Sequence, residues 1–539
     1  MDIDLDFLEH SPGQNFFSDF LSIADSHAAL DALVFGDQTQ NYGQLLASVN
    51  RCAGVLTALG VRPGSRVLLL VTNGLEMIWL QLALLRLGAR MAPCEIRMGA
   101  AQLVEIASDF RPQFLFYHDS VTSKARGMLD ALGGSPVAIA VASGSPEGSA
   151  DDTGHANLQD LLEQGATAEL PPLPEPENRV LVCYRPDRED HWRGAVFSLA
   201  ALCESAGQIR TLFALHRGDS VMCQLSLAHF VSLTTTVLPT LLSAGILVLL
   251  DRSWDDTRVI QQIDRFSPRL VLNTRKYFWY LTRSLQDAAD AGHPLKGSVK
   301  HALMLMDGVQ PRFRSQWESL VRGHLLAGFA PQCAAGFLAL DLPWLQRREE
   351  AVGKLLPGVD MRIIDEAGHA RPLGKWGEVQ VRSPRLAREF QCGDANNPEA
   401  PIDGWTPTRQ MAMSDGDGFL HLADEVFDVI WVYGFKVSPV EVEEPMLELP
   451  GIRDVAAVNA PRFRQPDRIQ VFVQLETRNG AAPLWTMESL QEKLDEMFPP
   501  YLRPAMITFV DHIPYDDEER KLRKELKFKY RNTEPWRSN

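Results

Sequence analysis

The chain has 539 residues, more than the ~250–300 at which a single hydrophobic core stops growing, so we expect at least two domains. A hydrophobic fraction of 45% and a charged fraction of 23% are those of an ordinary soluble globular protein. The formal net charge of -16 excludes nucleic acid as the expected partner, because phosphate contacts need a basic face.

The cysteines and the first residues indicate a cellular compartment. The 7 Cys show neither CxxC nor a Cys/His metal spacing, which is typical of a reducing environment without structural zinc. The opening stretch, MDIDLDFLEH, is acidic and lacks the basic and then apolar pattern of a signal peptide. We therefore expect a cytoplasmic protein without a metal site.

Strand-like runs alternate with helix-like runs through the first part of the chain. Leu75 to Leu87 is apolar at helical spacing, and short runs rich in Val, Ile and Leu precede and follow it. Such alternation with short turns predicts a doubly wound α/β core. The stretch 143–178 is rich in Gly, Pro, Ser and acids, so we expect a surface excursion there. The strand-like runs are 67–71, 113–117, 137–141, 180–183, 246–250, 270–272 and 302–306.

One apolar segment is long enough to cross a bilayer, which takes ~20 residues. Between Leu225 and Leu250 the only ionisable side chain is that of His229. The segment nevertheless contains several Ser and Thr, a Pro and a Gly, which favours a soluble core. We expect a buried helix that ends near 243–245, followed by a strand over 246–250, and no membrane span.

The second part of the chain has a different texture. After Val352, strands alternate with Gly turns and no helix is indicated, which predicts a β subdomain over about 350–427. From about Val429 the order is strand, helix, two strands, helix and strand, which predicts a small α+β domain. We therefore expect a large domain over 1–427 and a small domain over 428–539.

Three stretches resemble the adenylate-forming enzymes, which include acyl-CoA and aryl-CoA synthetases, adenylation domains of peptide synthetases and luciferases. They are NYGQLLASVNRCAGVLTALGVRPGSRV, VGKLLPGVDMRIIDEAGHARPLGKWGEVQVRSP and DGDGFLHLADEVFDVIWVYGFKVSPVEVEEPMLELPGIRDVAAV. The likeness runs from about residue 40 to 528. It implies an acyl-CoA synthetase-like fold whose small domain rotates about a hinge at Asp428.

The family's phosphate loop, YTSGTTGxPKG, corresponds here to YRPDREDHWRG, residues 184–194. In the family, backbone N–H groups and hydroxyls of this loop cradle the ATP phosphates. Here Arg185, Asp187, Glu189 and Arg193 occupy loop positions. A carboxylate ~4 Å from a phosphate charge costs on the order of 4 kcal/mol at an effective dielectric of 20. The arginines could bind an anion through their side chains, although a solvated, internally paired loop is the simpler interpretation.

The family's other nucleotide contacts have changed as well. In the YGxTE motif, the Thr that touches phosphate corresponds to Gln332 and the Glu that holds magnesium corresponds to Cys333, which is no hard oxygen ligand. The Asp of TGD that grips the ribose corresponds to Gln410, and the Arg of GRxxD to Glu425. The catalytic Lys corresponds to Arg520. We therefore expect no bound ATP or magnesium and no other cofactor.

The resemblance also assigns residues of this chain to binding of the acyl group. His229 falls in a segment that borders the acyl site in many relatives, and Cys333 is a second candidate catalytic residue. A core histidine and a buried apolar thiol are the structural alternatives. The resemblance implies that the acyl group is bound by His229, Phe230, Asp307, Gly308 and Phe329.

The small domain carries the family's loop for the pantetheine arm. Gly434, Phe435 and Lys436 match the tunnel that accepts a CoA or carrier-protein thioester. Because Arg520 is flanked by four carboxylates at 516–519, we expect Gly434 to lie nearer the acyl site than Arg520. The sequence sets neither the oligomeric state nor the acyl group.

Three functions are compatible with this pattern. The first is ATP-independent acyl transfer or condensation on a thioester of CoA or of an acyl carrier protein, in a biosynthetic pathway. The second is a non-catalytic scaffold, a pseudoenzyme within a complex. The third is an ATP-dependent acyl-CoA ligase with unusual nucleotide contacts.

Overall fold

A computed structural model divides the chain into two compact units. Unit 1 comprises Met1–Thr408 and Met413–Leu422, and unit 2 comprises Arg409–Ala412 and Ala423–Asn539. The structure describes residues 16–141, 154–165, 168–186, 191–306, 308–309, 311–348, 351–365, 367–391, 401, 403–425, 430–432, 435–437, 439–462, 465–476, 484–515, 521, 523 and 526.

Unit 1 contains two sheets, and the first is mainly parallel. Its strands are β3 Arg66–Leu70, β4 Arg90–Pro93, β5 Phe114–His118, β6 Val137–Val141, β7 Ala156–Asn157, β8 Arg179–Pro186, β9 Trp192–Ser198 and β19 Glu389–Gln391. Their order is β19-β9-β8-β4-β3-β5-β6-β7 within the described residues. The pairs from β8 to β7 are parallel, whereas β9 runs antiparallel to both β8 and β19.

The second sheet has a parallel centre and an antiparallel extension. Its strands are β1 Asp31–Phe35, β2 Gln38–Asn41, β10 Ser220–Cys223, β11 Ile246–Leu249, β12 Leu270–Asn273, β13 His301–Leu305, β14 His324–Phe329, β15 Ala339–Leu340, β16 Ala351–Leu355, β17 Asp360–Ile364, β18 Gly377–Arg382, β20 Thr406–Ser414 and β21 Phe419–Glu425. Their order is β17-β18-β20-β21-β16-β15-β14-β13-β12-β10-β11-β1-β2 in the described chain. Strands β1 and β10 to β14 pair in parallel, which confirms the doubly wound α/β core.

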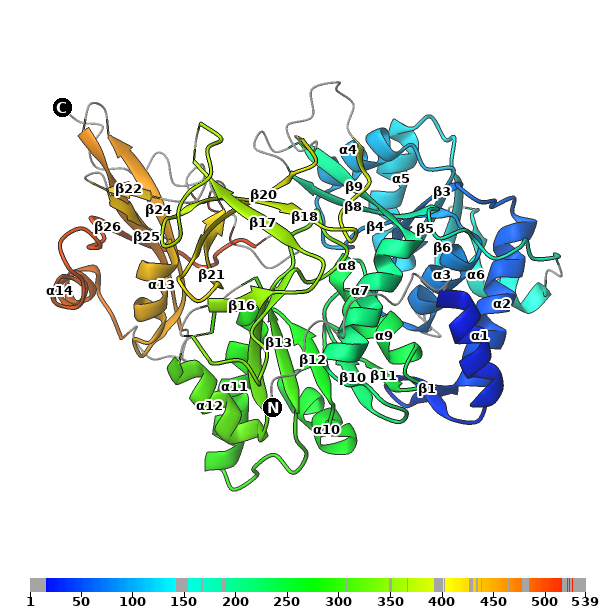
Figure 1. The fold of residues 1–539 in the computed structure, drawn as a ribbon, viewed down its shortest axis with the longest axis horizontal. Coiled ribbons are helices and arrows are strands. Elements are labelled where there is room, and N and C mark those ends of the chain that lie inside the picture. The colour runs from blue at the N-terminus through cyan, green and yellow to red at the C-terminus, as the bar shows by residue number, and fades with distance from the viewer. Residues whose placement is uncertain are drawn as a thin grey trace. The chain divides into compact units, whose positions relative to one another are not determined.

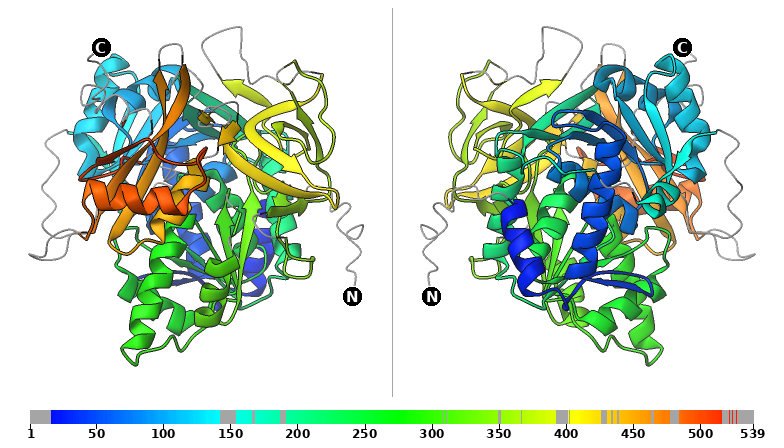
Figure 2. Two further views of the ribbon diagram at one scale, coloured as in Figure 1. Left: turned by 90° about the vertical axis from the view of Figure 1, so that its left-hand side faces the viewer. Right: turned by 90° about the vertical axis from the view of Figure 1, so that its right-hand side faces the viewer.

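Helices cover the outer faces of these sheets, and α10, α11 and α12 lie together beside β12 to β14 (Figure 1). Helices α1 and α2 run side by side in the right-hand view of Figure 2, and the rings of Phe20 and Tyr42 meet between them. Short polar side chains begin several helices: Ser198 accepts from the N–H of Ala201, and Asp255 from that of Arg258. The helices outside the buried central one are α1 Phe16–Ser26, α2 Tyr42–Ala58, α3 Leu75–Arg86, α4 Ala100–Phe110, α5 Thr122–Ala131, α6 Leu158–Gln164, α7 Leu199–Leu212, α10 Asp256–Phe266, α11 Arg275–Asp290 and α12 Pro311–Val321, with a 3-10 turn at Asp119–Val121.

The apolar segment 225–250 forms a buried helix followed by a strand, as the sequence predicted. The helix consists of α8 Phe230–Ser232, a π-helical turn η3 Leu233–Val237 and α9 Leu238–Leu241, and every residue in these three pieces is buried. Strand β11 follows. Within the described part of the chain, every helix is too short or too polar to cross a membrane.

The predicted surface excursion over 143–178 has more structure than a series of loops. Strand β7 and helix α6 lie in it, and Leu158 and Leu162 of α6 are buried in the core of unit 1. The helix begins at Asn157, whose side chain accepts from the N–H of Gln159. Residues 142–153 and 166–167 lie outside the described chain.

The described elements of unit 2 follow the predicted order, except that two strands and not one precede the first helix. A sheet of β24 Ile452–Arg462, β25 Gln465–Leu475 and β26 Met506–Phe509 packs with helices α13 Pro439–Leu447 and α14 Met487–Met497. A hairpin of β22 Ile430–Val432 and β23 Phe435–Val437 precedes it. The expected hinge, Asp428, lies outside the described residues, and so does Gly434.

Candidate functional site

The stretch 184–194 forms the two arms of a β-hairpin. Strands β8 and β9 pair antiparallel up to Tyr184↔Gly194, Arg185↔Arg193 and Pro186↔Trp192. The arms therefore extend past the predicted strand end at Cys183. Residues 187–190, which include Asp187 and Glu189, lie outside the described chain, so the predicted exposed turn is untested.

Helix α4 holds one face of this hairpin with two carboxylates. The Tyr184 hydroxyl donates to Asp109 Oδ2 at 2.6 Å, and the Trp192 N–H donates to Glu105 Oε1 at 2.9 Å. Burial, followed by the Asp109 carboxylate, raises the pKa of Tyr184 far above its usual value, and burial also raises the pKa of Asp109. A backbone donor of the stretch aligned with the family's phosphate loop is thus already bound to a carboxylate.

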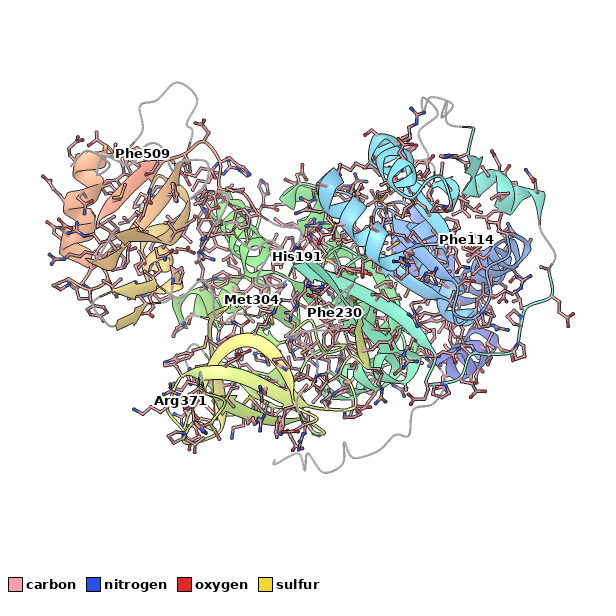
Figure 3. All side chains as sticks on the ribbon, turned by 90° about the horizontal axis from the view of Figure 1, so that it is seen from above. Phe114, His191, Phe230, Met304, Arg371 and Phe509 are labelled. Carbon is pink, nitrogen blue, oxygen red and sulfur yellow. The ribbon has the colours of Figure 1, made fainter. Side chains whose placement is uncertain are left out.

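The other face of the hairpin carries Phe197, which is part of an aromatic stack. Successive side chains alternate between faces, so Arg185 and Arg193 share a face with Phe197. The Phe197 ring stacks on Phe230 at 6.4 Å, and Phe230 stacks on His229 at 4.9 Å and 21°. Arg185 is 6% exposed. Phe230 is labelled in Figure 3, in the interior of unit 1.

Two side-chain amides, those of Asn73 and Gln81, form hydrogen bonds with the backbone of the segment that leads to His229. Asn73 Oδ1 accepts from the Leu227 N–H at 2.8 Å, and its Nδ2 donates to the Leu225 carbonyl at 3.1 Å. Gln81 Nε2 donates to the Leu227 carbonyl at 2.8 Å. The sequence analysis did not single out either residue, although Gln81 stands out as a polar residue within the apolar run 75–87.

His229 has a structural role at the start of helix α8. Its Nδ1 accepts from the Val231 N–H at 3.4 Å, which makes it the N-cap of α8. The half-buried ring lies on Phe230, so the histidine orients that aromatic side chain as well.

The carboxyl ends of the parallel strands meet at one edge of a sheet, where α/β proteins bind ligands. Strand β14 ends at Phe329, which is fully buried, and Gly308 follows β13 half-buried. Gln332 and Cys333 are 8% and 1% exposed, and the Cys333 carbonyl accepts from the Ala387 N–H at 2.8 Å. Asp307 lies outside the described residues. Among the residues that the structure describes, no group of His, Cys, Asp and Glu could hold a metal ion.

The segment aligned with TGD retains an unusual backbone. Thr408 Oγ1 donates to the Val379 carbonyl at 3.0 Å, and Arg409 has a φ of 62°. This left-handed conformation suits glycine, so an arginine adopts it at a cost of roughly 1–2 kcal/mol. Gln410 is buried and lies in β20, and Glu425 ends β21, where only its backbone is described.

In unit 2, Lys521 belongs to a buried ion network. Its Nζ lies 2.6 Å from Glu443 Oε2 and 3.7 Å from Asp454 Oδ1. Arg523 Nη2 donates to Glu443 Oε1 at 2.9 Å. An isolated antiparallel bridge joins Tyr515 and Lys521. Residues 516–520, which include Arg520, lie outside the described chain. Only the backbones of Phe435 and Lys436 are described, in β23.

Residues 22–390, more than half of the chain, match the AMP-binding enzyme family. The chain belongs to the AMP-binding enzyme family. This family member is 26% identical over 500 residues to the indoleacetate–CoA ligase of Aromatoleum aromaticum, covering 91% of this chain and 94% of that protein. It is 24% identical over 506 residues to the long-chain-fatty-acid–CoA ligase FadD13 of Mycobacterium tuberculosis, covering 93% and 95%.

Solved structures show the same fold for this AMP-binding enzyme family member. The anthranilate CoA ligase AuaEII in complex with anthranoyl-AMP matches with a TM-score of 0.85 at 19% identity, covering 97% of this chain and 99% of that one. ATP-bound MatB from Rhodopseudomonas palustris matches with a TM-score of 0.81 at 20% identity, covering 96% and 100%. The predicted acyl-CoA synthetase-like fold is therefore confirmed.

Proposed function

We propose that this family member binds an acyl thioester and transfers its acyl group without forming an adenylate. In such a transfer the thioester C–S bond breaks, a bond forms to an incoming nucleophile, and the proton of that nucleophile passes to the leaving thiolate. The observation that carries the proposal is the hydrogen bond from the Trp192 N–H to the Glu105 carboxylate.

That hydrogen bond disfavours the binding of a triphosphate at the hairpin. A phosphate cradle needs free backbone N–H groups, but Trp192 donates to a carboxylate and Pro186 has no N–H. Glu105 and Asp109 also place two acidic side chains against the same arms. The described residues of the hairpin therefore do not fit ATP in the family's manner, and no step of the proposed reaction uses ATP.

The small domain supports the same proposal. Because its Nζ is bound by Glu443 and lies close to Asp454, Lys521 is committed to the interior of unit 2. It cannot replace the family's catalytic lysine without breaking a buried ion pair, which costs roughly 3–5 kcal/mol. Only Arg520 remains at the aligned position, and a guanidinium is not equivalent to the compact ammonium of lysine.

The acyl side supports thioester binding. The stacked rings of Phe197, Phe230 and His229 form an apolar cluster, and Asn73 and Gln81 fix the segment that leads to it. The relatives named above are CoA ligases, whose product is a CoA thioester. A thioester of CoA, or of an acyl carrier protein with the same pantetheine arm, is therefore the proposed substrate.

The comparisons favour a second candidate, an ATP-dependent acyl-CoA ligase. The MatB structure was solved with ATP and the AuaEII structure with an acyl-adenylate, and both have this fold. In that case the side chains of Arg185 and Arg193 would have to replace the backbone cradle.

Titrations of the purified full chain with ATP–magnesium, acyl-CoA and acylated carrier protein separate these candidates. We expect ATP–magnesium to bind no tighter than millimolar and a thioester to bind at least tenfold more tightly. Pyrophosphate exchange supported by any carboxylic acid, or a detectable acyl-adenylate, would refute the proposal. Binding of neither thioester would refute it as well.

A further inference from the structure

Met306 has a strained backbone at the carboxyl end of β13. Its φ is 61°, in the left-handed region that glycine adopts without cost and that other residues adopt only with strain. Arg111, Ser267 and Arg322 share this conformation, but each of them directly follows a helix, where a left-handed residue commonly ends the helix. Met306 follows a strand, so helix termination does not explain its conformation.

The side chain of Met306 reaches from the end of β13 to the end of β14. Its Sδ accepts a hydrogen bond from the Ala330 N–H at 3.3 Å, and the Met306 N–H donates to the Gly328 carbonyl at 2.8 Å. These two contacts lie on either side of Phe329 along the chain, and Gly308 is two residues beyond Met306. Met306 therefore lies beside Phe329 and Gly308, two of the residues that the resemblance assigns to binding of the acyl group.

Met306 is more exposed than the neighbouring buried residues. It is half-buried, whereas Leu305, Phe329 and Ala330 are 8%, 0% and 5% exposed. In open α/β sheets, ligands bind outside the carboxyl ends of the parallel strands. The methionine is therefore placed at the edge of the sheet where the acyl group is expected, and part of it remains accessible there.

The strain at Met306 must be offset by something that its side chain does. Glycine at this position would adopt the same backbone angles without strain. The hydrogen bond from Ala330 compensates little, because a thioether sulfur is a weak acceptor. Strained non-glycine residues cluster at ligand sites, where the surrounding structure holds them in place. Packing of Met306 against the core of unit 1 is the structural alternative.

We propose that Met306 limits the length of the acyl chain that this protein accepts, because its side chain fills space that a glycine would leave open at the end of β13. This inference rests on the proposed thioester-binding function and adds the class of its substrate, a short-chain acyl thioester. The side chain of methionine is about as long as a butyl chain, so its removal makes room for a longer acyl group. Each additional buried methylene group then tightens binding by about fourfold.

The test compares straight-chain CoA thioesters by calorimetric titration of the full chain. The wild-type protein should bind octanoyl-CoA no more tightly than butyryl-CoA, because Met306 prevents burial of the additional methylene groups. Met306→Gly should bind octanoyl-CoA at least about tenfold more tightly than butyryl-CoA. This ratio separates the two roles, because a purely structural methionine would alter the affinity for both thioesters by the same factor.

Control variants separate the effect of side-chain volume from that of backbone strain. Met306→Leu keeps a side chain of similar size at the same backbone angles, so it should keep the wild-type ratio. Ala214→Gly replaces another left-handed residue, with a φ of 44°, at an exposed position after α7, and it should keep that ratio as well. If Met306→Gly fails to fold, Met306→Ala takes its place, since it removes most of the side chain and should show the same preference for octanoyl-CoA.

The outcomes that overturn the inference differ from those that refute the proposed function. A wild-type protein that already binds octanoyl-CoA tenfold more tightly than butyryl-CoA overturns the inference, and so does an unchanged ratio in folded Met306→Gly or Met306→Ala. Loss of folding in both variants overturns it too, because the methionine would then be required for packing. These results leave the thioester-binding function intact, whereas binding of no thioester by the wild-type protein refutes that function and this inference together.

Discussion

Glu443 is a carboxylate enclosed in unit 2 that accepts hydrogen bonds from Lys521, Arg523 and the N–H of Ala457. Burial by itself would raise the pKa of this group, but Arg523 and Lys521 outweigh burial and lower the pKa to about 2. Because the folded pKa is depressed, the stabilisation is present above the unfolded value of 4.5 and is lost as the pH falls toward 2. Its size is about 3 kcal/mol.

Glu443→Gln should therefore destabilise unit 2 at neutral pH. The substitution removes the carboxylate charge that Lys521 and Arg523 share, which costs roughly 3–5 kcal/mol. Hydrogen exchange in peptides from α13 and β24 should accelerate at pH 7, and the wild-type loss of protection between about pH 4.5 and 2 should be much smaller in the variant. The control Glu488→Gln, exposed on α14, should change protection by less than about 0.5 kcal/mol. Unchanged protection in Glu443→Gln would contradict the assigned network.

Some contacts of single residues could not be predicted from the sequence, because their partners are distant along the chain. The resemblance placed the family's lysine at Arg520, and no sequence periodicity predicts what the neighbouring Lys521 contacts. The position of Glu443, distant in sequence, commits Lys521 to the interior. Likewise, Ser205 and Gly336 meet only through tertiary packing, and no local pattern signals a hydroxyl that lacks a partner.

The β8–β9 hairpin contains the stretch that departs from the family's phosphate-loop motif. Gly194 is required there for close packing rather than for an unusual backbone angle. A Cβ at this position would lie 2.7 Å from Val182 Cγ1 and 3.0 Å from Tyr184 Cζ. The tyrosine ring is itself fixed by the bond to Asp109, so it cannot move away cheaply.

Gly194→Ala should destabilise unit 1 by roughly 1–3 kcal/mol, as overpacking of a tight core position does. The control Gly207→Ala lies on α7 with nothing within 4 Å of the added Cβ, and it should stabilise by up to about 1 kcal/mol. Thermal unfolding followed by intrinsic fluorescence measures both. Equal effects of the two substitutions would mean that the hairpin does not pack as described.

Elements were predicted well where a hydrophobic pattern was strong. The runs 67–71 and 246–250, and the helix over 487–497, follow the buried faces that the structure shows. The hairpin arms were predicted less well, because Arg185 and Arg193 have the composition of a loop. Their pairing depends on Glu105 and Asp109 of α4, which no local pattern connects to them.

Because the chain divides into two units, a ligand should stabilise the two by different amounts. A ligand stabilises only the unit that binds it, by RT ln(1 + [L]/Kd), which is about 2.7 kcal/mol at a hundredfold excess over Kd. The residues proposed to contact the acyl group, Phe197, Phe230 and His229, all belong to unit 1. For a unit of this size, that free energy corresponds to a rise in Tm of about 3 °C.

Calorimetric unfolding should therefore resolve two transitions that respond differently to ligands. A CoA thioester that the protein binds, at a hundredfold excess over its Kd, should raise the unit 1 transition by about 3 °C. It should raise the unit 2 transition by less than half as much. ATP–magnesium at 1 mM (about the tightest Kd expected for it) should shift the unit 1 transition by well under 1 °C, since RT ln 2 is about 0.4 kcal/mol. Glu443→Gln should lower only the unit 2 transition, which assigns the two peaks. An ATP-induced rise of the unit 1 transition comparable to that of the thioester would instead favour the ATP-dependent ligase.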